Sequence, residues 1–167
     1  MAVLAELEKN HRRGEKTVIF SSFTSYLDLL SDALSSAGYD TCRIDGKVPQ
    51  KKRAIEIQRF TDDDKFSVML CSLKACGVGI TLTRACNLFL TDLWWAPSVD
   101  LQAIDRVHRI GQTKPVNVLR FLVRDSIDEK IFDLQLKKIE LSQEVTKPLT
   151  RKELSALRAN DIMGLLN

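Results

Sequence analysis

The chain has 167 residues, of which 44% are hydrophobic and 28% are charged, and its formal net charge is +3 at pH 7. These values are ordinary for one folded domain, and so small a net charge permits contact with nucleic acid without arguing for it. The four cysteines lack C-x-x-C spacing and there are only two histidines, so we expect buried thiols in a reducing compartment and no metal site. No apolar run is long enough to cross a membrane and no signal peptide opens the sequence. Because the first residues read like the middle of a helix, we expect a piece of a larger protein.

Short apolar runs alternate with segments of helical periodicity along most of the chain. The run 17–20 predicts a strand, and 26–38 predicts a helix with Gly38 as its C-cap. A second strand is predicted over 40–44, and a helix with a proline in its first turn over 49–60.

The later apolar runs indicate the class of fold. Residues 66–72 and 87–93 are almost continuously apolar, which is typical of strands covered on both faces, and a further strand is predicted over 116–123. Strands that alternate with helices imply right-handed crossovers. The sequence therefore predicts an α/β fold with a parallel sheet between helix layers.

A helical extension is predicted after the last strand. Ser126 and Glu129 have the S-x-x-E spacing of a capping box that opens a long helix. Thr150 and Glu153 repeat this spacing before a last short helix, after a linker at 146–150. We therefore expect two parts: 1–125 and 126–167.

The stretch QAIDRVHRIGQTKPV, residues 102–116, places four polar side chains on one face of a predicted helix: Gln102, Asp105, Arg106 and Arg109. An apolar opposite face would dock on the sheet: Ala103, Ile104, Val107 and Ile110. One interpretation is a solvated surface with an Asp105–Arg109 ion pair, worth about 0.3–0.5 kcal/mol. The other is a catalytic pair, because two guanidinium groups that point the same way can stabilise the charge on a transferring phosphoryl group.

Two glycines follow a predicted buried strand, where an open parallel sheet places its ligand loops. Gly77 and Gly79 would let backbone N–H groups approach a phosphate closely, although a tight turn explains them equally well. The sequence has no G-x-x-x-x-G-K-[ST] loop, and GEKT at 14–17 is not one. A bound nucleotide would therefore need its main phosphate cradle from elsewhere.

Candidate nucleic-acid contacts also follow the predicted strands. We expect Trp94 to be a core or lid residue and Trp95 to face outward, where its ring can pack on nucleic acid. Ser22, Lys47 and Lys74 lie in loops on the same side and are placed for phosphate contact. The simpler interpretation makes each of them an ordinary surface residue.

Five segments together resemble the second-lobe motifs of the Swi/Snf-type DNA translocases, within the superfamily 2 helicase-like ATPases: TVIFSSFTSYLDLL, RIDGKVPQKKR, SLKACGVGITLT, LWWAPS and QAIDRVHRIGQTKPV. From Gln102 to Gln112, the last segment meets every fixed position of the family form Q-A-x-D-R-x-H-R-I-G-Q. The resemblance covers residues 16 to about 140. The double tryptophan and the closing motif are most similar to the branch that contains helicase-like transcription factor and related post-replication-repair translocases.

The resemblance implies two RecA-like lobes with ATP in the cleft between them, and this chain is then the second lobe. It implies that Arg106 and Arg109 are arginine fingers and that Gln102 orients the cleft side of their helix. The loop from Gly77 to Gly79 would then couple the nucleotide site to the DNA groove.

On the DNA side, the resemblance places Trp95 against the backbone, with Ser22 and Lys74 near the same strand. It also makes the helix after residue 126 a brace that packs on the lobes. Three positions depart from the usual glycine, asparagine and asparagine of the family: Cys76, Thr81 and Ala96. The last two departures remove hydrogen-bonding groups that we expect on the DNA side.

We therefore expect the second motor lobe of an ATP-dependent double-stranded DNA translocase that acts in chromatin remodelling or DNA repair. The first lobe of the same protein would hold Mg²⁺ with ATP, and the isolated chain would be inactive. Duplex DNA, and nucleosomes or other DNA-bound proteins, are the expected partners, in the nucleus or in a bacterial cytoplasm. The alternatives are a non-catalytic DNA- or protein-binding module, and a small-molecule α/β enzyme, for which no nucleophile–base set or dinucleotide fingerprint is present.

Overall fold

The computed structural model describes residues 2–77 and 79–144. These residues divide into two compact units. The sheet unit contains the residues up to Asp92 together with Ser98–Phe121. The helix unit contains Leu93–Pro97 and the described residues from Leu122 onward.

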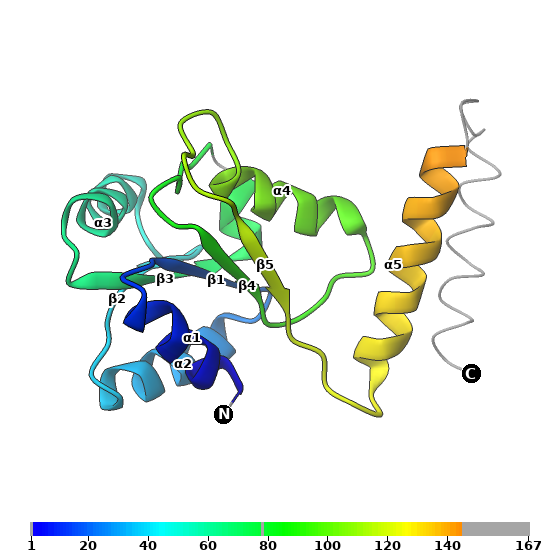
Figure 1. Cartoon of the computed structure of the whole chain (residues 1–167), viewed down its shortest axis with the longest axis horizontal. Helices are drawn as coiled ribbons and strands as arrows, with labels where there is room; N and C mark the ends of the chain where they lie inside the picture. Colours follow the sequence, from blue (N-terminus) through cyan, green and yellow to red (C-terminus); the bar gives the residue numbers. More distant parts are fainter. Residues whose placement is uncertain (1, 78, 145–167) are drawn as a thin grey trace. The chain divides into compact units, whose positions relative to one another are not determined.

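Five parallel strands form the sheet, in the order β2-β3-β1-β4-β5 (Figure 1). Their bounds are β1 Thr17–Ser21, β2 Asp40–Ile44, β3 Phe66–Ser72, β4 Asn87–Leu90 and β5 Asn117–Arg120. Every residue of β1, β3 and β4 is buried, as expected of parallel strands with helices on both sides. The predicted α/β fold with a parallel sheet is therefore confirmed.

Helices cover both faces of this sheet (Figure 1). α1 (Ala2–Arg12) and α2 (Thr24–Ser36) pack on one face, and α3 (Gln50–Asp62) and α4 (Pro97–Val107) pack on the other. Successive side chains of β1 enter opposite cores, because a strand alternates its side chains between the two faces. Phe20 packs in the same core as Phe60 of α3, whereas Ile19 packs in the same core as Leu30 of α2.

Several element ends differ from their predictions. β4 ends before the predicted residue 93, because the side chains of Thr91 and Asp92 bond the end of β1 instead. β5 ends at Arg120, before the predicted residue 123, and the Phe121 N–H still bonds Leu90 O (2.9 Å) directly after it. By contrast, Gly38 ends α2 as predicted: it follows the C-cap residue Ala37 with φ +86°, the left-handed conformation in which helices commonly end.

A buried lysine joins the end of α3 to the start of β1. Lys16 is 5% exposed, and its Nζ donates to three carbonyl oxygens: Phe60 (2.6 Å), Asp63 (2.8 Å) and Phe66 (3.3 Å). Burial lowers the pKa of Lys16, and the nearby carboxylate of Asp64 opposes this effect. Since Phe60 lies in the last turn of α3, the ammonium group satisfies a carbonyl that the helix itself leaves open. The GEKT segment thus has a packing role.

The helix unit contains α5 (Ile127–Glu144). Ser126 Oγ accepts the Asp128 N–H (3.1 Å), and the Asp128 carboxylate accepts the Val123 N–H (3.0 Å). A side-chain cap therefore opens the helix as predicted, but the carboxylate that reaches back belongs to Asp128 and not to Glu129. Three predicted features lie outside the described residues: the linker at 146–150, Thr150 and Glu153.

Candidate functional site

Helix α4 ends at Val107, so Arg109 lies in the loop that follows it. The prediction of one helical face that includes Arg109 is therefore wrong. Two hydrogen bonds explain the early end: Leu82 N–H donates to Arg106 O (2.8 Å), and the Gln112 side-chain amide donates to Val107 O (3.3 Å). The carbonyl oxygens that another helical turn would use are thus already occupied.

The apolar face of α4 is predicted correctly up to the same point. Ala103 and Val107 are fully buried, and Ile104 packs against the same core. Ile110 was expected on that face but is 100% exposed, because it lies beyond the end of the helix. The next residue, Gly111, has φ +102°, a conformation that favours glycine and turns the chain away.

Arg106 and Arg109 form no ion pair within the described residues. Arg109 is exposed, and its Nη1 donates to Thr81 Oγ1 (3.0 Å). Arg106 is half-buried, and its Nε is buried without a hydrogen-bond partner among the described residues. Gln102 and Asp105 are exposed on the same helix. The Asp105–Arg109 pair that the solvated-surface interpretation requires is absent from the described part of the chain.

Thr81 lies in a different place from the one expected of it. The sequence suggested that it removes a hydrogen-bonding group from the DNA side, but its hydroxyl contacts Arg109. The reason is the path of the chain between β3 and β4, which starts with the short helix η1 (Leu73–Gly77) and reaches the end of α4 at Leu82. Gly79 lies on this path and has φ +26°. Thr81 therefore lies beside Arg109, just beyond the end of α4.

Gln112 is a site residue that sequence reasoning missed. Its Nε2 donates to Ala85 O (2.7 Å) and to Val107 O (3.3 Å), while its Oε1 accepts the Lys114 N–H (2.9 Å). One amide thus joins the end of α4 to the segments that precede β4 and β5. The available signal was its position as the last fixed residue of the closing motif. This junction lies at the edge of the sheet where the strands begin, since Ala85 is two residues before the start of β4.

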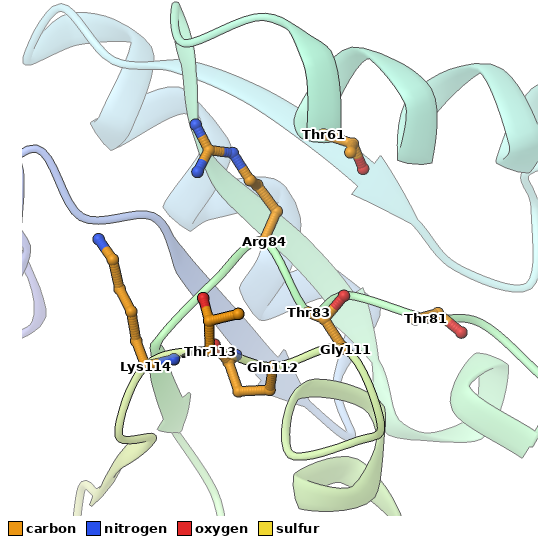
Figure 2. Close-up of a pocket in the computed structure, with 8 residues that line it drawn as sticks. All are labelled: Thr61, Thr81, Thr83, Arg84, Gly111, Gln112, Thr113 and Lys114. Carbon is orange, nitrogen blue, oxygen red and sulfur yellow. Dashed lines mark hydrogen bonds between the residues drawn. The ribbon is translucent and has the colours of Figure 1, made fainter.

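A polar pocket of about 210 Å³ lies beside the junction (Figure 2). Its lining consists of Thr61, Thr81, Thr83, Arg84, Gly111, Gln112, Thr113 and Lys114. Arg84 is partly neutralised by Asp64, whose Oδ1 lies 3.3 Å from Arg84 Nη2. The lining includes no carboxylate or imidazole that could act as a general base. The described lining of this pocket therefore offers no group for general-base catalysis.

The two lysines and the serine lie at the edge of the sheet opposite the Gln112 junction. Ser22, Lys47 and Lys74 follow β1, β2 and β3, which are parallel neighbours, so they lie at the edge where these strands end. Both lysines are exposed and Ser22 is half-buried. The Ser22 N–H donates to Asp92 Oδ1 (2.9 Å) and Oδ2 (3.1 Å). Of the two donors of Ser22, only the hydroxyl is then available to an anionic ligand.

A buried carboxylate holds the turn that carries Lys47. Asp45 is 2% exposed, and it accepts hydrogen bonds from the Lys47 N–H (2.8 Å) and from Arg43 Nε (2.8 Å). Burial alone would raise the pKa of Asp45, but these hydrogen bonds outweigh it and lower the pKa below its usual value. Arg53 also donates to Asp45 O (3.0 Å). Lys47 is therefore an exposed side chain on a turn that several hydrogen bonds stabilise.

The two tryptophans belong to the helix unit. Trp94 is half-buried, Trp95 is 50% exposed, and their ring centroids are 4.8 Å apart. Gln135 Nε2 donates to Trp94 O (2.6 Å) and Lys138 Nζ donates to Trp95 O (3.3 Å), so α5 anchors the backbone of the pair. The prediction that Trp95 is the more exposed ring is confirmed.

The described residues contain no cluster of three or more potential metal-ligating side chains, and none of their helices is long and apolar enough to span a membrane. Cys42, Cys71 and Cys86 are buried thiols, as predicted, and burial raises the pKa of Cys42 to about 12. A thiol with so high a pKa is a poor nucleophile. The side chain of Cys76 lies outside the described structure.

Comparisons with known proteins show which family this sequence and fold resemble. A family model described as the helicase conserved C-terminal domain matches residues 1–111. The DNA repair protein RAD5A of Arabidopsis thaliana is 40% identical over 98% of this chain and 16% of that protein. In Schizosaccharomyces pombe, the DNA repair protein rad8 is 46% identical over 74% of this chain and 11% of that protein, and the ATP-dependent helicase rhp16 is 40% identical over 93% and 18%.

A solved structure of the C-terminal part of the Fun30 ATPase domain resembles this chain with a TM-score of 0.77 and 36% identity. The match covers 96% of this chain and 52% of that one. The chain thus spans 11% to 18% of the length of the three curated relatives named above.

Proposed function

Because the chain belongs to the helicase conserved C-terminal domain family, as a RecA-like lobe of the Swi/Snf type, we propose that it is the second motor lobe of an ATP-dependent double-stranded DNA translocase. The names of the relatives, two DNA repair proteins and an ATP-dependent helicase, support a role in DNA repair or chromatin remodelling. Hydrolysis and movement are then activities of the whole two-lobed parent. The first lobe and duplex DNA are its proposed partners, with nucleosomes as a further substrate, in the nucleus.

The observation that carries this proposal is the pair of arginines without ion-pair partners at the end of α4. Asp105 lies one turn before Arg109, yet the described residues contain no ion pair between them. A buried donor without a partner lowers the stability of a fold by about 1–3 kcal/mol. The buried Nε of Arg106 therefore destabilises the lobe unless a ligand accepts its hydrogen bond. Two forked cations kept free of carboxylates are what a phosphoryl-transfer site needs.

In the proposed mechanism, ATP supplies the phosphoryl group, and Arg106 and Arg109 donate hydrogen bonds to its oxygens as negative charge develops there. Gln102, exposed on the same helix, orients the cleft side of α4. The first lobe provides the triphosphate cradle and holds Mg²⁺, because this chain has no P-loop. The isolated chain is therefore inactive. The path through Gly77 and Gly79 is the proposed coupling between the nucleotide and DNA sides.

DNA contact is proposed for Ser22, Lys47, Lys74 and Trp95. Neither lysine has an ion-pair partner among the described residues, so each charge is available to a phosphate. The Ser22 hydroxyl can donate to a DNA phosphate, and the half-exposed Trp95 ring can pack on the DNA backbone. Neither contact reads the bases. Binding should then follow the shape and charge of DNA and not its sequence.

The test replaces each arginine with alanine in the two-lobed parent. Arg106→Ala and Arg109→Ala should each lower the ATPase kcat by at least ~10³-fold and leave the DNA Kd nearly unchanged. Lysine should not rescue either one, because an ammonium group lacks the planar fork. Arg12→Ala is the matched control, since Arg12 is an exposed arginine that already pairs with Glu8.

Near-normal turnover in both variants would refute the catalytic assignment. If DNA binding persisted in that case, the chain would be a non-catalytic binding module that retains the lobe. Loss of DNA affinity together with turnover would instead place the arginines in the DNA contact.

A further inference from the structure

Arg109 depends on Thr81 for its position. The hydrogen bond from Arg109 Nη1 to Thr81 Oγ1, at 3.0 Å, is the only one that its guanidinium makes to a described residue. Because Arg109 lies beyond the end of α4 and is exposed, neither the helix nor the core holds its side chain. A free arginine side chain samples many rotamers, so this single contact sets its direction.

Thr81 itself is tied to the helix end that carries both arginines. The next residue, Leu82, is 1% exposed, and its N–H donates to Arg106 O at 2.8 Å. A few residues further on, Ala85 O accepts the Gln112 amide at 2.7 Å, and Gln112 N–H donates to Arg109 O at 2.9 Å. The hydroxyl and the guanidinium are therefore attached to the same junction.

We propose that Thr81 is a positioning residue that holds Arg109 ready for the transferring phosphoryl group; this inference rests on the proposed function. A guanidinium has five N–H donors, so one bond to a hydroxyl leaves four for phosphate oxygens. A carboxylate at this position would neutralise the charge, whereas a hydroxyl orients the guanidinium and leaves its charge intact. The threonine hydroxyl thus places a neutral acceptor beside Arg109.

The experiment compares three variants of the two-lobed parent. Thr81→Val keeps the shape but removes the hydroxyl, and it should lower kcat by about 5- to 10-fold with little change in the KM for ATP, because the lost contact acts in the transition state. Thr81→Ser keeps the acceptor and should restore kcat to within about twofold of the parent. Thr83→Val is the matched control, since Thr83 makes no side-chain hydrogen bond to any described residue. Its kcat should not change.

A double-mutant cycle then tests whether Thr81 acts through Arg109. Thr81→Val should cause no further loss in the Arg109→Ala background, because nothing remains to be positioned. If Arg109→Ala itself turns over normally, the proposed function fails. If Arg109→Ala is slow, the inference alone fails when Thr81→Val turns over as fast as the parent or faster. It also fails when Thr81→Val lowers kcat by the same factor in the Arg109→Ala background as in the parent.

Discussion

Replacement of Trp95 by alanine separates a DNA contact from a core residue. The ring is 50% exposed, and the bond from Lys138 to the Trp95 carbonyl does not depend on the side chain. Truncation of a fully buried tryptophan costs about 3–5 kcal/mol, so a half-exposed ring should cost about 1.5–2.5 kcal/mol. At roughly 2–4 °C per kcal/mol for a chain of this size, Tm should fall by about 3–10 °C.

The functional effect should be larger than this loss of stability. In the two-lobed parent, a triplex-displacement assay run beside an ATPase assay gives the displacement achieved per ATP hydrolysed. Trp95→Ala should retain ATPase activity and lose displacement, because a ring that braces the DNA backbone is needed for movement and not for hydrolysis. Trp94→Ala is the control, since Trp94 is the more buried ring and should lose more stability.

Two results would refute this reasoning. A loss of the full 3–5 kcal/mol expected of a buried ring would show that Trp95 is a core residue. Normal melting together with normal displacement per ATP would show that the ring is neither core nor DNA brace.

Two further predictions concern the junction and the DNA side. Gln112→Met should lower the unfolding free energy by about 1–3 kcal/mol, because it leaves the Ala85 and Val107 carbonyl oxygens without this donor; urea denaturation measures this, and an unchanged midpoint beside a Thr113→Val control would contradict it. Binding of labelled duplexes by this chain should be weak, independent of sequence and much weaker at moderate than at low salt. A clear sequence preference would argue against phosphate contacts.

The fold was predictable because its signals are local. A strand buried on both faces must be apolar throughout, so the runs at 66–72 and 87–93 indicated a parallel sheet before any contact was known. Helical periodicity likewise predicted the buried face of α4 at Ala103 and Val107. Errors occurred at element ends, where partners far along the chain decide the outcome.

The candidate site was predictable only in part for the same reason. The closing motif marked Arg106 and Arg109, but periodicity extended their helix too far, since nothing in the local sequence indicates that Leu82 occupies the Arg106 carbonyl. Gln112 and Asp92 went unnoticed because a polar side chain with distant backbone partners resembles a surface residue in sequence. The family resemblance predicts Thr81 on the DNA side, whereas in the structure its hydroxyl contacts Arg109.

The sequence by itself determined the α/β class, the two helix layers and the family, because continuous apolar runs, helical periodicity and a contiguous motif are properties of neighbouring residues. Only the tertiary structure decided where α4 stops, which neutral acceptor Arg109 meets, and that the lysines and the arginines lie at opposite edges of the sheet. These features depend on hydrogen bonds between residues such as Leu82 and Arg106, whose separation in sequence is closed only when the β3–β4 crossover packs against α4. Burial removes water from competition for those bonds, so the packed chain selects among conformations that the local sequence leaves open.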